Sequence, residues 1–399
     1  MTSIVEPTTA QLENLVAPYL TLQPVAFAIG YASPSFANNG NIFLAGSVQS
    51  QLDTALNLNR NTLFEIASIS KTFTATLYAL LLRSKSSTLT VGDFTDPNGP
   101  LHISSTLGTI TLDDLMSYTS GLPQDSVDAK VDSPPYWAYP YSMPGMLSYL
   151  NLSPPPIKCT GKAFTYSNLG FALMSSIIAA GADIAPTAVD FAHLVRENVF
   201  EPLSMQSKFF DGVPLGRLPA GYTYHSLSIP VYTQTNPGWV FFPAYFGAGG
   251  IVASPNDMWQ WLLFNMGITQ NSVLSPLLPA LQSPATTVKD PAGDQLGLGW
   301  FISPAENGSV STVWKDGELD GFNSYIAFLA SPDPGSTPSQ AGVFVLVNAS
   351  GIVNDHGVEI VAAIANDLLL IMQGQEPPED KSKYPRADLR RPRLMKRRA

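Results

Sequence analysis

The chain has little cysteine and little histidine. Its 399 residues include one cysteine, Cys159, and four histidines, His102, His193, His225 and His356. A single cysteine excludes an internal disulfide framework, and no Cys/His pair has the spacing of a zinc site. The histidines are scattered, so we interpret each as a surface or packing residue. The sequence therefore predicts neither a metal site nor a cofactor, and it disfavours a histidine-dependent triad.

Long apolar runs and targeting segments are also missing. No stretch reaches the roughly 18 uninterrupted apolar residues that a transmembrane helix needs. Residues 1–20 contain acidic residues and prolines, and they do not resemble a secretory signal. We therefore expect a cytoplasmic protein without a transmembrane segment. Secretion stays open as an alternative, because N-x-[ST] glycosylation sequons occur at Asn151, Asn307 and Asn348.

The charge is unevenly distributed along the chain. Residues 381–399 contain nine Lys or Arg and one acidic residue, whereas the preceding 380 residues contain 12 basic and 30 acidic groups. An acidic body repels phosphates, so nucleic-acid binding is disfavoured. We expect residues 376–399 to form a basic, solvated and disordered tail, because like charges repel and apolar anchors are few. Docking of this tail on the acidic body or on an anionic surface is the alternative.

The periodicity of apolar residues predicts strands near both chain ends and helices between them. Helical spacing at 9–20 is followed by two β-rich runs, 25–31 and 41–48. Further helices are predicted at 72–82 and at 254–266, where a Ser/Pro cap begins the second. Near the C-terminus, four strands and a closing helix are predicted at 298–302, 310–315, 324–329, 342–348 and 358–372.

This order predicts an α+β fold. We expect an antiparallel β-sheet built from both chain termini and flanked by helices, with an inserted, mainly helical region. One domain is expected over 10–375. Its sheet part is expected at about 10–72 and 295–375, and its helical part at about 73–294.

Ser68 and Lys71 stand three residues apart at a predicted helix start. Residues i and i+3 share one face of a helix, so Lys71 Nζ can reach Ser68 Oγ and activate it as a nucleophile. A serine hydroxyl is a poor nucleophile at neutral pH unless another group accepts its proton. The spacing therefore suggests nucleophilic catalysis, although an S-x-x-K match by itself is a weak signal.

Two further motifs follow in a fixed order. Tyr166-Ser167-Asn168 opens the apolar run 169–178, and Lys315-Asp316-Gly317 ends a predicted strand. With Ser68-x-x-Lys71, these motifs resemble the serine β-lactamase and penicillin-binding-protein superfamily, particularly class C β-lactamases and the related esterases and transacylases. Segments similar to that family also lie at 110–123, 200–205, 247–257 and 297–300.

The resemblance implies a β-lactamase/transpeptidase-like fold and a role for each motif residue. Ser68 is the implied nucleophile, and either Lys71 or Tyr166 is the implied base, with the choice left open. Asn168 is implied to bind substrate or to hold Lys71. Backbone amides of Ser68 and Glu318 are the implied oxyanion donors.

The third motif departs from the family pattern. Relatives usually carry Thr or Ser between Lys315 and Gly317, where this chain has Asp316, and Glu318 follows. In β-lactamases this strand helps to bind the drug's carboxylate, and two added negative charges repel such a group. We therefore expect Lys315, Asp316 and Gly317 to bind or orient a different substrate, with weak or no penicillin hydrolysis. Pairing of Asp316 with Lys315 is the alternative.

Two aromatic-rich loops suggest an apolar substrate, although packing between loops explains part of their composition. We expect a serine hydrolase of an ester, lactone, amide or thioester of an apolar small molecule. An acyltransferase of secondary metabolism that uses the same acyl-enzyme is the alternative. An α/β-hydrolase is disfavoured because no G-x-S-x-G elbow occurs, and a binding protein with a dead site is disfavoured because the motifs are complete. The aromatic residues are Tyr136, Trp137, Tyr139, Tyr141, Tyr222, Tyr224, Tyr232, Trp239, Phe241, Phe242, Tyr245 and Phe246.

Overall fold

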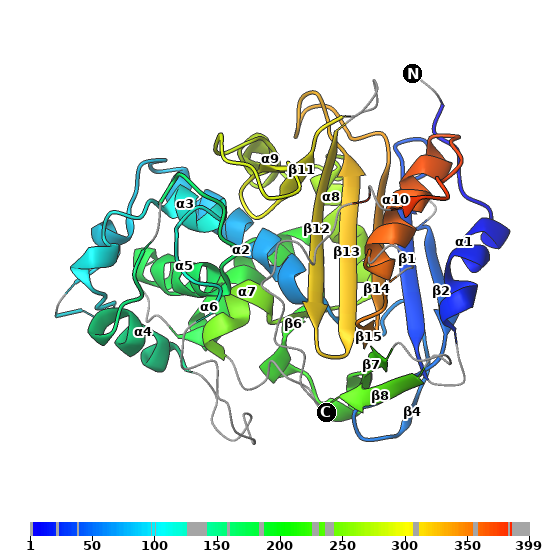
Figure 1. Ribbon diagram of the computed structural model, residues 1–399, viewed down its shortest axis with the longest axis horizontal. Coiled ribbons are helices and arrows are strands. Elements are labelled where there is room, and N and C mark those ends of the chain that lie inside the picture. Colours follow the sequence, from blue (N-terminus) through cyan, green and yellow to red (C-terminus); the bar gives the residue numbers. More distant parts are fainter. Residues whose placement is uncertain are drawn as a thin grey trace.

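The fold is seen in a computed structural model of the chain (Figure 1). The structure describes residues 3–20, 24–37, 40–96, 98–99, 101–125, 142–157, 160–182, 187–225, 231–235, 243–305, 311–353, 358–381 and 384. Of the predicted basic tail, 376–399, the structure describes residues 376–381 and 384. There Lys381 forms an ion pair with Asp367, and the Tyr384 hydroxyl donates to Asp367 Oδ1 at 2.6 Å.

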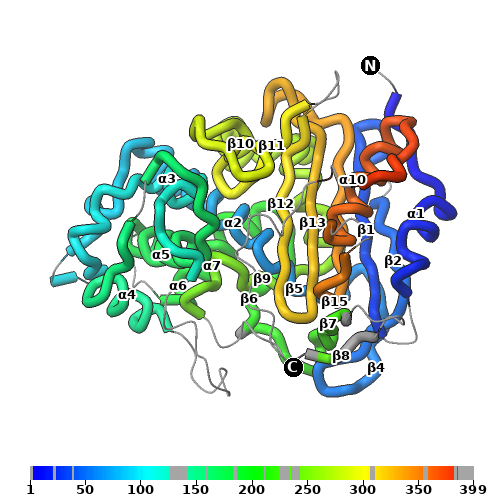
Figure 2. The backbone as a smooth tube through the Cα atoms, in the orientation of Figure 1, coloured from blue at the N-terminus to red at the C-terminus, as the bar shows by residue number. Residues whose placement is uncertain are grey.

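A seven-stranded antiparallel sheet joins the two ends of the chain, as the sequence predicts (Figure 2). β1 pairs with β14, so the N-terminal segment lies beside the C-terminal one. Every residue of β1, β13 and β14 is buried, which fits the apolar sequences of β1 and β14, whereas β13 also buries the polar residues Asn323 and Ser324. In order across the sheet, the strands are β10 (Gln295–Leu296), β11 (Phe301–Ser303), β12 (Thr312–Leu319), β13 (Phe322–Leu329), β14 (Gly342–Val347), β1 (Ala26–Ala32) and β2 (Ile42–Gly46).

Two hairpins differ from the expected strand boundaries. Of the strand expected at 298–302, only residues 301 and 302 lie in a strand, β11, because residues 297–300 form the turn from β10, in which Gly299 has φ +78°. β12 continues to Leu319, four residues beyond its expected end at 315, because Gly321 at φ +92° closes a tight turn into β13. Asp316, Gly317 and Glu318, which were expected to follow the strand, therefore lie within β12.

Helices cover both faces of the large sheet (Figure 1). α1 (Thr9–Val16) packs against β2, and α10 (Ile360–Met372) packs against β13 and β14. α8 (Pro255–Asn265) packs against β1 and β14 on the other face. α8 begins at the predicted position because Ser254 and Asp257 form a capping box and Pro255 occupies the first turn.

The remaining helices form a group beside the sheet, on the left of Figure 1. α2 is buried along its whole length and contacts α5 and α7. Its last turn widens into a π-helical turn at Ala79–Arg83. These helices are α2 (Ser70–Tyr78), α3 (Leu112–Met116), α4 (Met143–Leu152), α5 (Asn168–Gly181), α6 (Ala188–Val195), α7 (Phe246–Gly249) and α9 (Leu278–Gln282).

Three small sheets complete the fold. One of them has the strand order β5-β9-β6 and leads directly into the turn that carries Ser68. In the described part of the chain, no helix combines the length and the apolar character that crossing a membrane requires. The small strands are β5 (Phe64–Glu65), β9 (Ile251–Ala253), β6 (Lys208–Phe209), β15 (Ala349–Ser350), β7 (Gly221–His225), β8 (Val231–Thr235), β3 (Val48–Gln49) and β4 (Ala55–Leu56).

Candidate active site

Ser68 stands on a sharp turn between a strand and a helix. The turn, η3 (Ala67–Ile69), connects β5 to α2, and 8% of Ser68 is exposed. Ala67 has φ +49°, a left-handed conformation that costs a non-glycine residue about 1 kcal/mol. Strain of this kind is often found at functional sites, where surrounding contacts maintain it. Packing of β12 against η3 supplies such contacts here.

Lys71 lies on the first turn of α2 and is fully buried. Its Nζ donates a hydrogen bond to Ser68 Oγ at 3.1 Å, which is the contact that the i, i+3 spacing predicts. It also donates to Asn168 Oδ1 and to the Ala248 carbonyl, both at 2.7 Å. A buried amine needs such partners because burial removes its hydration. Three elements, α2, α5 and α7, thus fix Nζ beside the serine hydroxyl.

Tyr166 lies between the two lysines of the motifs. Lys71 Nζ is 5.0 Å and Lys315 Nζ is 5.4 Å from the centre of the Tyr166 ring, within the range of cation–π interactions. The ring stacks on Tyr118 at 5.4 Å, and 4% of the residue is exposed. Residues far apart in sequence are therefore brought together around one aromatic ring.

Lys315 is paired with its neighbour Asp316. Its Nζ donates to Asp316 Oδ1 at 2.6 Å and to the Asp316 carbonyl at 2.7 Å. Lys315 is fully buried and Asp316 is 2% exposed, so water screens this ion pair poorly. Of the two orientations considered from the sequence, the structure has Asp316 pointing toward Lys315.

Gly317 lets β12 approach the serine turn closely. A Cβ at this position would lie 2.4 Å from the Ile66 carbonyl oxygen and 3.0 Å from the Ser68 amide nitrogen. The described pairing with β11 ends at Trp314, so the following part of that edge of β12 faces η3. Ser324 Oγ of β13 also donates to the Ile66 carbonyl, at 2.8 Å. The backbone of β12 around Glu318 therefore borders the Ser68 turn.

Asp125 belongs to this group of residues, and the sequence analysis missed it. Asn168 Nδ2 donates to Asp125 Oδ1 at 3.0 Å, while Asn168 Oδ1 accepts from Lys71. The Asn168 backbone amide donates to the Gln124 carbonyl at 2.8 Å. The only sequence signal was position, since Asp125 comes directly after the family-like segment 110–123. No local pattern links it to Asn168.

Glu65 is a buried carboxyl group just before the serine turn. It is 3% exposed, and its Oε1 has no hydrogen-bond partner in the described part of the chain. Burial, and secondarily the negative charge of Asp320, raise the pKa of Glu65 to about 8. This side chain is therefore protonated at neutral pH, and no local pattern in the sequence indicates its burial.

Several aromatic residues expected at a substrate pocket belong to the hydrophobic core instead. Tyr222, Tyr245 and Phe246 are each at most 3% exposed, and the Phe246 ring stacks on Phe209 at 5.3 Å. Tyr224 packs against the same core. These four residues account for part of the aromatic content of the loops, namely the part that we expected to serve packing. The side chains of Tyr136, Trp137, Tyr139, Tyr141, Tyr232, Trp239, Phe241 and Phe242 lie outside the described residues.

Comparisons with known proteins agree with this geometry. The unguisins hydrolase ungD' of Aspergillus campestris is 28% identical over 69% of this chain and 52% of its own length, so the chain spans about half of that relative. The penicillin-binding protein homologue of Pyrococcus abyssi superposes with a TM-score of 0.68 at 18% identity, over 93% of this chain and 77% of that one. A class C β-lactamase superposes with a TM-score of 0.66 at 20% identity, over 90% and 95% of the two chains.

These structural likenesses establish the fold, which is that of the serine β-lactamases and penicillin-binding proteins. The family model with the description Beta-lactamase matches residues 35–365, which include all three motifs. The chain therefore belongs to the Beta-lactamase family.

Proposed function

We propose that the protein is a serine hydrolase that works through an acyl-Ser68 intermediate. The observation that carries this proposal is the hydrogen bond from fully buried Lys71 Nζ to Ser68 Oγ, on a strained turn. In the first step, Ser68 Oγ attacks the substrate carbonyl and its proton passes to Lys71 or Tyr166. The leaving group then takes up a proton as the acyl-enzyme forms. In the second step, water attacks the acyl group and releases Ser68.

Backbone amides are proposed to stabilise the oxyanion. The amide of Ser68 is 3.0 Å from the position that a Gly317 Cβ would occupy, so β12 and the turn border the same space. The amide of Glu318 is the second proposed donor. Backbone donors are held rigidly by β12 and η3, so they require little rearrangement during the reaction.

The Lys315–Asp316 pair supports a substrate without a carboxylate at this strand. A cation already bound to a buried carboxylate has less to offer a second anion. We therefore propose an ester, lactone, amide or thioester of an apolar small molecule, with weak or no β-lactamase activity. A cytoplasmic location and a basic tail that contacts an anionic surface complete the proposal.

An acyltransferase of secondary metabolism is the second candidate, because the acyl-enzyme is common to both reactions. The name of the Aspergillus relative, unguisins hydrolase, favours hydrolysis. The two functions are separated by incubating the acyl-enzyme with amine and alcohol acceptors and measuring free acid against acylated acceptor.

The decisive experiment is labelling with a fluorophosphonate, followed by intact and peptide mass spectrometry. One adduct is expected on Ser68, absent from Ser68→Ala and formed more slowly in Lys71→Ala and Tyr166→Phe. Ser87→Ala, which removes an exposed serine, should label like the wild type. Labelling of another residue, or undiminished labelling of Ser68→Ala, would contradict the proposal.

A further inference from the structure

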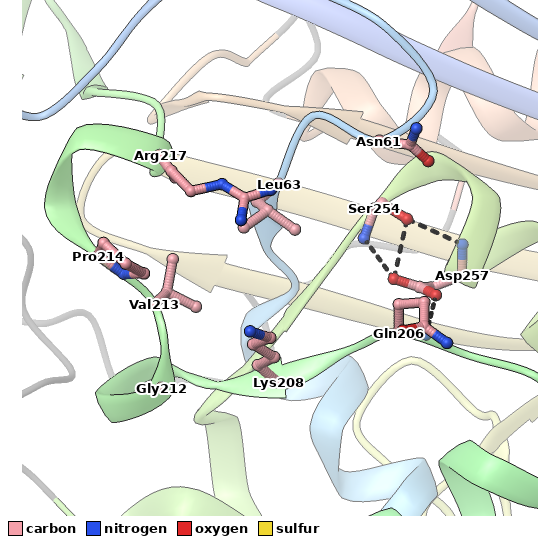
Figure 3. A pocket seen from close by; sticks show the side chains of 10 residues that line it. All are labelled: Asn61, Leu63, Gln206, Lys208, Gly212, Val213, Pro214, Arg217, Ser254 and Asp257. Carbon is pink, nitrogen blue, oxygen red and sulfur yellow. Dashed lines mark hydrogen bonds between the residues drawn. The ribbon is translucent and has the colours of Figure 1, made fainter.

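A cavity lies where the small sheet β5-β9-β6 meets the start of α8 (Figure 3). Its volume is about 420 Å³. Leu63 immediately precedes β5, Lys208 belongs to β6, and Ser254 follows β9. None of the residues to which we assign a catalytic role lines this cavity.

One side of the cavity is apolar. Leu63 and Val213 belong to a small hydrophobic cluster that is separate from the main core. Pro214 extends the apolar surface next to Val213 (Figure 3). This surface is suited to the hydrocarbon part of a ligand, because contact there removes apolar area from water.

Two cations accompany this apolar surface. Lys208 comes from β6 and Arg217 from the turn η12 (Leu215–Arg217); the Arg217 side chain extends toward Leu63, and Lys208 lies below the two in Figure 3. Both residues are exposed, and neither forms an ion pair with any residue that the structure describes. The chain as a whole carries a net charge of −10, so two cations that line one cavity differ from their acidic background.

The carboxylate that lines the cavity is already occupied. Asp257 Oδ1 accepts from the Gln206 amide at 2.6 Å, and Oδ2 accepts from the Ser254 amide and hydroxyl at 3.0 and 2.8 Å. Asp257 is 3% exposed and caps α8, so it is not positioned to pair with the two cations. Lys208, Arg217 and Asp257 together leave one positive charge at the cavity.

We propose that this cavity binds a small apolar carboxylic acid. The carboxylate would lie between Lys208 and Arg217, whose guanidinium presents a planar pair of donors. The hydrocarbon part would cover Leu63 and Val213. A monoanion matches the single net positive charge, whereas a doubly charged phosphate ester would face Asp257 with excess negative charge. The site is distinct from that of the proposed hydrolase, and its test does not depend on catalysis.

The test is calorimetric titration of Ser68→Ala with 4-phenylbutanoate and with its uncharged analogue 4-phenylbutanamide. The acid should bind about tenfold or more tightly than the amide, because a hydrogen bond to a charged group is worth more than a neutral one. Lys208→Gln and Arg217→Gln should each weaken binding of the acid by about tenfold. Added salt should weaken it as well.

Lys85→Gln is the control, because it removes one exposed cation outside the cavity and should leave binding unchanged. A second arm repeats the titration on wild-type protein with Ser68 blocked by a fluorophosphonate. Loss of binding in that arm would place the acid at Ser68 and overturn the proposal. Equal binding of acid and amide, binding unaffected by either charge substitution, or no binding up to the solubility limit would overturn it too.

Discussion

The two lysines of the candidate site, Lys71 on α2 and Lys315 on β12, are equally buried but have different partners. Lys71 donates to a hydroxyl, an amide and a backbone carbonyl, all uncharged oxygens. Lys315 donates to the carboxylate and the carbonyl of Asp316. If Lys315 lost its proton, the buried Asp316 carboxylate would be left without its cation. These three hydrogen-bond partners of Lys71 Nζ include no carboxylate, so loss of a proton carries no such cost in these contacts.

We propose that this difference gives the two lysines different tasks. Lys71 Nζ donates to the Ser68 hydroxyl, whereas Lys315 is paired with Asp316 and lies beside the Tyr166 ring. We expect the first to matter mainly for the rate of acylation and the second for which substrates are accepted.

The largest effect is expected from Lys71→Met. If Lys71 takes the Ser68 proton, its loss should lower the rate of acylation by p-nitrophenyl butyrate about 10³-fold, since general bases typically contribute 10²- to 10⁴-fold. Lys315→Met should lower it about tenfold or less. Stopped-flow release of p-nitrophenol measures both rates, and circular dichroism checks that each variant is folded. Equal losses in the two variants would end the distinction between the lysines.

Asp316→Thr should open Lys315 to a substrate carboxylate. Nitrocefin hydrolysis is expected to rise about 10- to 100-fold, the value of a charge-assisted hydrogen bond. Asp333→Asn, which removes an exposed acid from a distant loop, is the matched control and should change nothing. Wild-type turnover of nitrocefin that already equals that of a dedicated β-lactamase would refute the role given to Asp316.

Glu65 and Asp316 are both buried acids, but within the described residues only Asp316 has a lysine bonded to its carboxylate. Burial without such a cation keeps Glu65 protonated. Its pKa is raised from 4.5 to about 8, so the folded state holds a proton that the unfolded state releases between these values. The buried, protonated Glu65 therefore stabilises the folded state fully below pH 4.5. This contribution to the free energy of unfolding should be lost as pH rises from 4.5 to 8. Glu65→Gln should be more stable than the wild type by about 1 to 3 kcal/mol at pH 8 and similar at pH 4.

Urea unfolding from pH 4 to pH 9 measures this difference in stability. Glu13→Gln, which changes an exposed acid, should follow the wild-type curve. A Glu65→Gln curve parallel to the wild type over the whole range would show that the carboxyl is ionised in the folded protein.

The smallest effect is expected from Asp125→Asn. The Asp125 carboxylate accepts from Asn168 Nδ2 and so keeps Asn168 Oδ1 toward Lys71. An amide at position 125 can present a donor instead, so acylation should slow about three- to tenfold through looser positioning of Lys71. Stopped-flow acylation and urea unfolding are compared with those of Asp93→Asn, an exposed acid. Unchanged acylation would remove Asp125 from the site.

Local sequence patterns predicted those contacts of the site that join residues close together in the sequence. The i, i+3 spacing on one helix is sufficient to bring Lys71 to Ser68, and the Ser254-Pro255 pair likewise predicted the start of α8. Asn168 and Ala248 are 97 and 177 residues from Lys71, so no periodicity could pair them with it. The resemblance to a known family implied a place for Asn168 but none for Asp125. The turn at 297–300 was missed because its apolar residues also fit a strand.

The order of strands and helices, the antiparallel sheet built from both ends and the three motifs follow from the sequence, because they depend on hydrophobic period, turn residues and short spacings. The pairing of Asp316 with Lys315, the burial of Glu65 near Asp320, and the position of Lys208 and Arg217 at an apolar cavity become visible only in the folded protein. Each of these depends on distances between segments that local preferences do not fix. Packing of those segments determines how deeply each charged group is buried, and burial determines the strength of its electrostatic interactions and the shift of its pKa.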